Sequence, residues 1–229
     1  MLNSQLSQSN EDYLKNIWLL EEKTGKTAGV RALAKRMRLS ASTVSEAMKK
    51  LAEQGYVEHH RYSGITLTEL GRKIAVQMAR KHRLIETFLV AELDYSWEEV
   101  HDEAEALEHA VSEHFVAKID EILGHPTADP HGDPIPNAAG EVSSSPLKLL
   151  SEVRNLEQVV IARVSDENPE VLSFLADANI LPGVSCRIKA ISEALGTITL
   201  TPDSGTDAQI TFLVANHIWV TDQSGSTPQ

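Results

Sequence analysis

The sequence of 229 residues contains a single cysteine, Cys186. One cysteine cannot form an internal disulfide, and it cannot supply a cysteine-cluster metal site. We interpret Cys186 as a buried strand residue rather than a reactive thiol. No apolar run approaches bilayer length, so we expect no membrane-spanning helix and no membrane partner. The N-terminal stretch MLNSQLSQSNEDY has no apolar signal core, so we expect a cytoplasmic protein.

Several motifs that mark enzymes are also absent from the chain. There is no HExxH pair of a zinc peptidase, no glycine-rich phosphate loop and no serine nucleophile elbow. The sequence therefore gives no direct sign of catalysis, and we expect a protein that is not an enzyme.

Charge is distributed unevenly along the chain, although the net charge is −12. Residues 1–83 contain 15 Lys and Arg against 8 Asp and Glu, a net of +7. The remaining residues contain 6 against 25, a net of −19. Such asymmetry indicates different partners for the two parts. The basic part suits a phosphate backbone, and the acidic part suits cations.

Hydrophobic periodicity predicts a mainly α protein with a small β-domain. We expect one long helix over 96–123 with Ser96 as N-cap, and a small β-barrel from five strands, VVIARV, CRIKAI, TITLT, QITFLV and HIWVT. Residues 125–152 contain five of the nine prolines of the chain, which indicates a linker. The predicted segments are a winged helix-turn-helix domain over 1–73, a helical domain over 74–124, a Pro-rich linker over 125–152, a β-domain over 153–221 and a disordered tail over 222–229.

The stretch VRALAKRMRLSASTVSEAMKKL has the spacing of a helix-turn-helix. Ser40 is a predicted N-cap, and small hydroxyl residues at the start of the second helix suit entry into a major groove. YVEHHRYSGITLTELG then predicts a two-stranded wing. The alternative is a helical hairpin with a solvated basic face. The predicted DNA contacts are Ser40, Ser42, Thr43, Ser45 and Glu46, with the basic residues Arg31, Arg38, Lys49, Lys50 and Arg61.

The stretch HDEAEALEH places two histidines and four acidic residues within nine positions. On a helix, His101, Glu105, Glu108 and His109 share one face beside an apolar stripe. A solvated acidic face is one interpretation. A divalent metal site is the other, since imidazole and carboxylate are ligands of first-row divalent ions. His82 and Glu86 in KHRLIETFL form a second i, i+4 pair. A metallohydrolase that uses these residues, and a regulator that needs no metal, stay as alternatives.

Together, the winged helix, RKHRLIETFL, VHDEAEALEH, the DPIP segment and the β-domain resemble the diphtheria-toxin-repressor family over nearly the whole chain. The resemblance implies a metal-dependent repressor that binds a pseudo-palindromic DNA operator as a homodimer and controls metal-uptake genes. It also implies an SH3-like third domain of the FeoA type.

The resemblance further implies two metal sites. The primary site maps to Asp12, Glu105, Glu108 and His109, and the ancillary site maps to His82, Glu86 and His101. The β-domain of three-domain members adds an acidic or amide pair, for which this chain offers Glu167 and Glu170.

Two of these positions indicate the metal. Iron-responsive members have Met and Cys where this chain has Asp12 and Glu105, so the chain resembles the manganese-transport-regulator branch. Hard oxygen ligands suit Mn²⁺ better than sulfur does. We therefore expect Mn²⁺ as cofactor, with Fe²⁺, Co²⁺, Zn²⁺ or Cd²⁺ as substitutes, and keep an iron-dependent regulator as the alternative.

Overall fold

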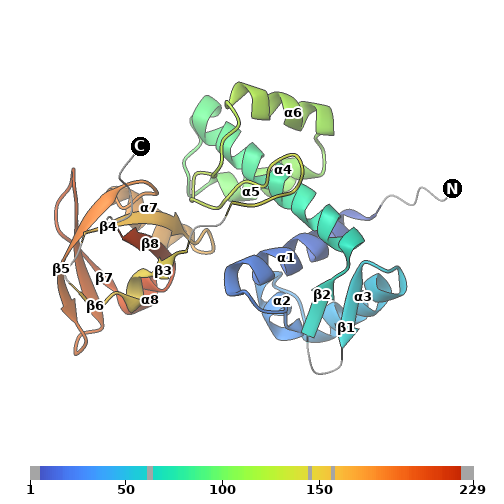
Figure 1. The fold of residues 1–229 in the computed structure, drawn as a ribbon, viewed down its shortest axis with the longest axis horizontal. Helices are drawn as coiled ribbons and strands as arrows, with labels where there is room; N and C mark the ends of the chain where they lie inside the picture. Colours follow the sequence, from blue (N-terminus) through green and yellow to red (C-terminus); the bar gives the residue numbers. More distant parts are fainter. Residues whose placement is uncertain (1–5, 61–63, 144–145, 156–157, 223–229) are drawn as a thin grey trace. The chain divides into compact units, whose positions relative to one another are not determined.

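A computed structural model describes residues 6–60, 64–143, 146–155 and 158–222 (Figure 1). Its contacts divide the chain into two compact units. Unit 1 comprises residues 1–82, 108–112 and 136–142, and unit 2 comprises residues 83–107, 113–135 and 143–229. No helix in the described part is both long enough and apolar enough to cross a membrane.

Unit 1 begins with three helices, α1 (Gln8–Thr24), α2 (Val30–Arg36) and α3 (Ala41–Glu53). Ser7 caps α1 by accepting a hydrogen bond from the backbone N–H of Asn10, and Gly25 ends it with φ 64°, a left-handed conformation that glycine adopts without steric cost. Ser40 caps α3 as predicted, because its side chain accepts from the backbone N–H of Thr43. The buried apolar residues of these helices and of β2 form one core, which includes Leu14, Ile17, Leu33, Val44, Met48, Leu51 and Ile65.

A two-stranded antiparallel hairpin follows α3, as the sequence predicts for a wing. It consists of β1 (Val57–His60) and β2 (Gly64–Leu67), with Val57 paired to Leu67 and His60 paired to Gly64. Three helices followed by this hairpin make a winged helix-turn-helix (Figure 1). The predicted contact Arg61 lies outside the described residues.

The helical segment contains α4 (Glu69–Leu93), α5 (Val100–Glu108) and α6 (Glu113–Ile122). The single helix expected over 96–123 is wrong. Two helices form there instead, and α5 ends at Glu108, so His109 follows the helix rather than continuing it. Ser96 is not the N-cap of α5, because this helix begins at Val100. The Ser96 hydroxyl donates to the Glu99 carboxylate at 2.7 Å.

The β-domain in unit 2 is a six-stranded antiparallel sheet with the order β3-β8-β4-β5-β6-β7. Most expected strands are confirmed, but QITFLV is not one strand. Its first residues belong to β7, which ends at Thr211, and its last residues form the short helix α8, which Thr211 caps. The elements are β3 (Lys148–Leu149), β4 (Gln158–Val164), α7 (Pro169–Asp177), β5 (Ser185–Ser192), β6 (Thr197–Pro202), β7 (Ala208–Thr211), α8 (Phe212–Ala215) and β8 (Ile218–Asp222).

Residues 129–133 of the Pro-rich segment 125–152 pack against β4. Asp129, His131 and Asp133 are buried, and the backbone N–H of Val164 donates to the carbonyl of His131 at 2.8 Å. A Cβ added to Gly132 would lie 2.1 Å from the carbonyl oxygen of Ala162. These contacts hold residues 129–133 against β4, next to the irregularity in its pairing with β8 between Ile161 and Arg163.

Candidate metal centres and nucleic-acid interface

Unit 1 contains a cluster of three potential metal ligands, Asp12, Glu108 and His109, whose ligand atoms lie within 4.8 Å of one another. Asp12 lies in the first turns of α1, and the other two lie where α5 ends. The Nε2 atom of His109 is 2.8 Å from the Asp12 carboxylate and 3.5 Å from the Glu108 carboxylate. The cluster therefore joins a helix of the DNA-binding fold to a segment almost 100 residues later in the chain.

Glu108 is buried and is held at both carboxylate oxygens. Its Oε1 accepts from the ammonium of Lys15 at 2.6 Å, and its Oε2 lies 2.7 Å from His82 Nδ1. Burial raises the pKa of Glu108, but the hydrogen bond and charge of His82, together with those of Lys15, lower it overall. Glu108 is therefore an anion even though its carboxylate is only 1% exposed.

Glu105 belongs to unit 2 and is half exposed. Its carboxylate lies 3.9 Å from the Nε2 atom of His101, one helical turn earlier on α5. Within unit 1, the structure brings together three of the four residues predicted for the primary site. Glu105 as a ligand remains a prediction.

A second cluster lies within unit 2 and is built around Glu86. Its Oε1 is 3.2 Å from His101 Nδ1, and its Oε2 is 3.9 Å from His131 Nδ1. The ligand atoms of Glu86, Asp129 and His131 lie within 4.8 Å of one another, and all three residues are buried. The loop after α6 thus contributes two potential ligands, which lie in the segment predicted as a linker.

The imidazole of His131 presents one free nitrogen to this second cluster. Its Nε2 donates to the carbonyl of Trp97 at 2.7 Å, so the neutral ring carries its proton there and keeps a lone pair on Nδ1. Nδ1 is buried and has no hydrogen-bond partner among the described residues. An imidazole held in this way is ready to bind a cation.

The carboxylate of Asp129 has both acidic and basic neighbours. Its Oδ1 accepts from the backbone N–H groups of His131 and Asp133, both at 2.9 Å. Burial raises its pKa well above the usual value, and the charges of Asp133 and Glu86 raise it further, whereas the guanidinium of Arg83, 3.7 Å from Oδ2, lowers it. Arg83 and Arg163 also pair with Asp133. The two arginines offset part of the negative charge, and a divalent cation bound by Glu86, Asp129 and the Nδ1 atom of His131 would offset more of it.

The β-domain reaches the second cluster through Asp166, whose carboxylate is 3.3 Å from His101 Nδ1. The predicted contributors Glu167 and Glu170 are both exposed, and neither belongs to a cluster of potential ligands in the described part of the chain. His82 precedes Glu86 by one turn of α4, and its Nδ1 lies 2.7 Å from Glu108 Oε2. The ancillary set of His82, Glu86 and His101 remains a prediction.

Five residues in or beside these clusters were not predicted from the sequence: Asp129, His131, Asp166, Glu11 and Lys15. The DPHGD spacing, which puts a histidine two residues from each of two aspartates, was a signal that could have found the first two. The other three have no local signal, since each depends on a contact that joins distant parts of the chain.

The recognition helix α3 has a buried apolar side and an exposed polar side. Val44, Met48 and Leu51 are buried, whereas the predicted DNA contacts on α3 are exposed. The turn before α3 places Arg38 at φ 55°, and the backbone N–H of Leu39 donates to the carbonyl of Ala34 at 2.9 Å. The predicted contacts outside the helix, Arg31, Arg38 and Ser40, are exposed as well.

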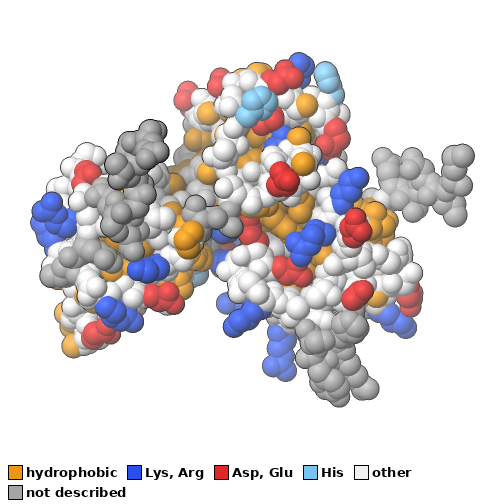
Figure 2. All heavy atoms as spheres, in the orientation of Figure 1, with side chains coloured by type: hydrophobic (Ala, Val, Ile, Leu, Met, Phe, Trp, Pro, Cys, Tyr) orange, Lys and Arg blue, Asp and Glu red, His pale blue; other side chains and the backbone are white. Residues whose placement is uncertain are grey.

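Two of the predicted contacts pair with each other. The Lys50 ammonium lies 2.9 Å from the Glu46 carboxylate, and both side chains are exposed. Lysine and arginine side chains project from the surface of the part that contains α1–α3 (Figure 2). The face of α3 therefore combines hydroxyl groups, exposed cations and one acidic residue that competes for Lys50.

Family models match the chain in three consecutive parts. They are the iron-dependent repressor N-terminal DNA-binding domain at residues 5–65, the iron-dependent repressor metal-binding and dimerisation domain at 68–137, and the FeoA domain at 148–222. The iron-dependent repressor IdeR of Mycobacterium tuberculosis is 30% identical, over 95% of this chain and 94% of that protein.

The chain belongs to the iron-dependent repressor family, which includes the diphtheria toxin repressor.

Solved structures of this family share the whole fold. A manganese-dependent transcriptional repressor in complex with manganese is 45% identical, with a TM-score of 0.87, over 93% of this chain and 99% of that one. The manganese regulator SloR is 34% identical, with a TM-score of 0.76, over 93% and 98%. The predicted fold is confirmed: an N-terminal winged helix-turn-helix, a helical domain and a C-terminal FeoA domain of the SH3-like type.

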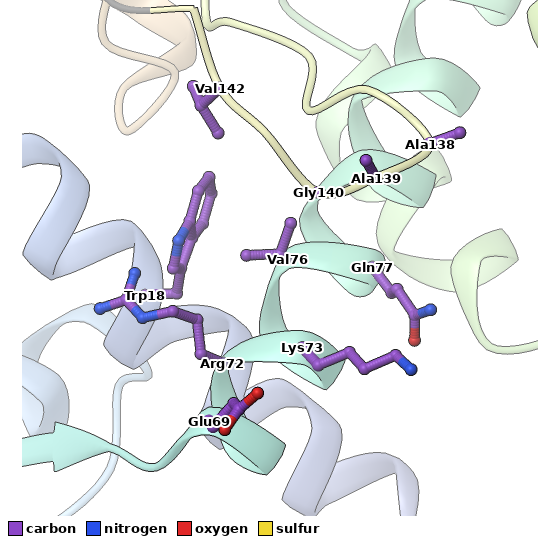
Figure 3. Close-up of a pocket in the computed structure, with 10 residues that line it drawn as sticks. All are labelled: Trp18, Glu69, Arg72, Lys73, Val76, Gln77, Ala138, Ala139, Gly140 and Val142. Carbon is purple, nitrogen blue, oxygen red and sulfur yellow. The ribbon is translucent and has the colours of Figure 1, made fainter.

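Proteins of the iron-dependent repressor family are transcriptional repressors, not enzymes. One pocket of unit 1 lies between α1, α4 and residues 138–142, with Trp18, Val76 and Val142 around its apolar part (Figure 3). None of the candidate metal ligands lines it, so this pocket is not a substrate cleft beside a metal, which the metallohydrolase alternative requires.

Proposed function

We propose that this chain is a Mn²⁺-activated transcriptional repressor that binds operator DNA as a homodimer and controls metal-uptake genes. The observation that carries the proposal is the cluster of Asp12, Glu108 and His109. It joins α1 of the winged helix to the end of α5, so occupancy of the cluster acts directly on the DNA-binding fold.

The proposed primary centre uses Asp12, Glu108 and His109, with Glu105 as a fourth ligand. A bound divalent ion supplies positive charge that offsets the repulsion between the carboxylates. Lys15 and His82 hold the Glu108 carboxylate, and His109 faces Asp12 through Nε2. Once these residues share an ion, α1 is held against the segment after α5, which favours one position of the recognition helix.

The proposed second centre uses Glu86, Asp129 and His131, with His101 and Asp166 beside Glu86. The ancillary set of His82, Glu86 and His101 that the family resemblance implies stays a candidate as well. One contact supports the set with His131: its buried Nδ1 faces Glu86 without a hydrogen-bond partner among the described residues.

The proposed metal is Mn²⁺, because both clusters offer carboxylate and imidazole groups and no sulfur. Cys186, the only cysteine, lies in the core of the β-domain. The manganese-dependent repressors among the structural relatives support this choice. Iron is the second candidate, because the curated relatives include iron-dependent repressors.

The proposed partners are a second copy of this chain and a duplex operator. The match of residues 68–137 to a metal-binding and dimerisation domain supports the homodimer. Two copies of α3 would then meet two half-sites, so the operator is expected to be pseudo-palindromic. A repressor works where the chromosome is, which gives the cytoplasm as the proposed location.

The test is selection of duplex DNA from a random-sequence library by the full chain, in the presence of Mn²⁺ or of a chelator. We expect a pseudo-palindromic sequence to be enriched with Mn²⁺ alone. Binding to that sequence is then measured across titrations of Mn²⁺, Fe²⁺ and Zn²⁺. The control variant is Glu121→Gln, which alters an exposed acidic residue outside both clusters.

Enrichment of the same sequence with chelator would refute metal activation. Enrichment of no sequence under any condition would refute the DNA-binding proposal. A response to Fe²⁺ at metal concentrations well below those needed for Mn²⁺ would favour the iron alternative.

A further inference from the structure

Two consecutive acidic residues at the start of α1 contact the imidazole of His109 on opposite sides. Glu11 Oε2 is 3.0 Å from Nδ1, and Asp12 Oδ1 is 2.8 Å from Nε2. The ring is only 12% exposed, so neither nitrogen faces open solvent. Each nitrogen therefore has its own carboxylate.

The surroundings of the two nitrogens of His109 differ. Nε2 lies near both Asp12 and Glu108, the two other proposed ligands within unit 1, at 2.8 Å and 3.5 Å. Nδ1 has only Glu11 as a described partner. Histidine binds a metal through one nitrogen while the other commonly donates its proton to a carboxylate, a carbonyl or water. The geometry thus separates a metal-facing side of the ring from a proton-donating side.

We propose that Glu11 is a positioning residue for the primary metal centre. Its carboxylate accepts the Nδ1–H of His109, which fixes the tautomer and keeps the Nε2 lone pair directed at Asp12 and Glu108. The inference rests on the proposed function, because it concerns the centre assigned there. It adds a residue outside the proposed ligand set.

The competing explanation for Glu11 is electrostatic support of the helix. Glu11 lies in the first turn of α1, where a negative charge interacts favourably with the helix dipole. That role needs only charge, whereas the positioning role needs an acceptor atom beside Nδ1. Three variants separate the two roles. Glu11→Ala removes both charge and acceptor, and Glu11→Gln keeps an acceptor oxygen without charge.

The third variant combines Ser9→Asp with Glu11→Ala. Ser9 is exposed and lies in the same first turn, so the double variant restores the charge without restoring the acceptor at Nδ1. Thermal unfolding of each variant shows whether α1 is still stable. Compared with Glu11→Ala, the double variant restores only the charge, whereas Glu11→Gln restores only the acceptor atom.

The readout is ¹⁵N NMR of the histidine rings in the full chain, with Cd²⁺ as a diamagnetic probe. His109 is assigned by the signals that His109→Gln removes. In the wild type with Cd²⁺ we expect a protonated Nδ1 and a metal-bound Nε2. In the metal-free protein at about pH 9, where an ordinary imidazole is neutral, we expect the same tautomer.

Glu11→Ala is expected to give a mixture of tautomers in the metal-free protein and to weaken Cd²⁺ and Mn²⁺ binding by about 10- to 100-fold. Glu11→Gln is expected to keep the wild-type tautomer and most of the affinity. The Ser9→Asp, Glu11→Ala variant is expected to remain defective.

An unchanged His109 tautomer in Glu11→Ala would overturn the inference. So would rescue by the Ser9→Asp, Glu11→Ala variant but not by Glu11→Gln, since charge alone would then be sufficient. If His109→Gln left metal binding unaltered, the proposed centre itself would fail. The tautomer of the metal-free protein would then still report whether Glu11 orients the ring.

Discussion

The ammonium of Lys15 lies 2.6 Å from the Glu108 carboxylate, and the two side chains are 2% and 1% exposed. These residues are 93 positions apart in the chain. The pair gives the buried anion a permanent cationic partner, so Glu108 does not depend on a metal ion for all of its charge compensation.

Replacing Lys15 with Met is expected to destabilise the chain, because the buried charge of Glu108 would lose its permanent cation and keep only the imidazoles of His82 and His109 as described partners. Removal of one member of a buried ion pair costs about 3–5 kcal/mol. Chemical denaturation measures the change. Lys118→Met is the matched control, since Lys118 pairs with Glu121 on the surface, and it is expected to unfold like the wild type. Equal stability of the two variants would contradict the importance of the buried pair.

The two proposed centres are expected to lose metal independently. Asp12→Ala should remove the ion of the primary centre, and His131→Ala should remove the ion of the second one. Equilibrium dialysis with elemental analysis would then find one Mn²⁺ fewer per chain in each case. DNA binding should fall much further in Asp12→Ala, because only Asp12 lies on a helix of the winged domain. A His131→Ala variant with wild-type metal content would exclude His131 as a ligand.

Lys49 and Lys50 are expected to contact phosphates. The double change to Ala should weaken binding to every duplex and flatten the dependence of affinity on salt, by up to about one slope unit per lost contact. Glu46→Gln should act in the opposite direction, because it releases Lys50 from its 2.9 Å ion pair. Fluorescence anisotropy over a range of salt concentrations tests both. An intact salt slope in the double variant would show that these lysines do not contact the backbone.

The Asp12→Met, Glu105→Cys double variant tests the choice of metal. A thiolate and a thioether favour softer ions over Mn²⁺. We expect the variant to respond to Fe²⁺, Co²⁺ or Ni²⁺ at lower concentrations than to Mn²⁺, whereas the parent responds strongly to Mn²⁺. Anaerobic DNA-binding titrations keep the new cysteine reduced. An unchanged order of metals would mean that these two positions do not determine selectivity.

Cys186 is expected to be inert in the folded chain. It is fully buried on β5, and burial, with a smaller effect of Asp203, raises the pKa of its thiol to about 11. Alkylation by iodoacetamide at about pH 8 should therefore require unfolding. Between an unfolded pKa of about 8.5 and the folded value of about 11, the unfolded chain loses the proton first, so stability should fall as the pH rises. The Cys186→Ala variant should lose this part of the pH dependence of stability. If the stability of the variant still falls with pH as in the wild type, other groups cause the dependence.

Local patterns in the sequence were sufficient for most of the secondary structure. The spacing of VRALAKRMRLSASTVSEAMKKL predicted α2 and α3, and Ser40 predicted the start of α3 correctly, because caps and periodicity act within one or two turns. The same reasoning failed where local preference is weak. It joined α5 to α6, and it extended β7 through residues that form α8.

The sequence by itself determined which chemical groups were available: clustered carboxylates and imidazoles without a nearby cysteine, and a basic helix-turn-helix. The tertiary structure decided which of these groups meet. It brought Asp129, His131 and Asp166 toward Glu86 and His101, left Glu167 and Glu170 exposed, and buried Lys15 against Glu108. Helix periodicity depends on neighbours a few residues apart, whereas these contacts join segments tens of residues apart and form only when the packed core brings them together.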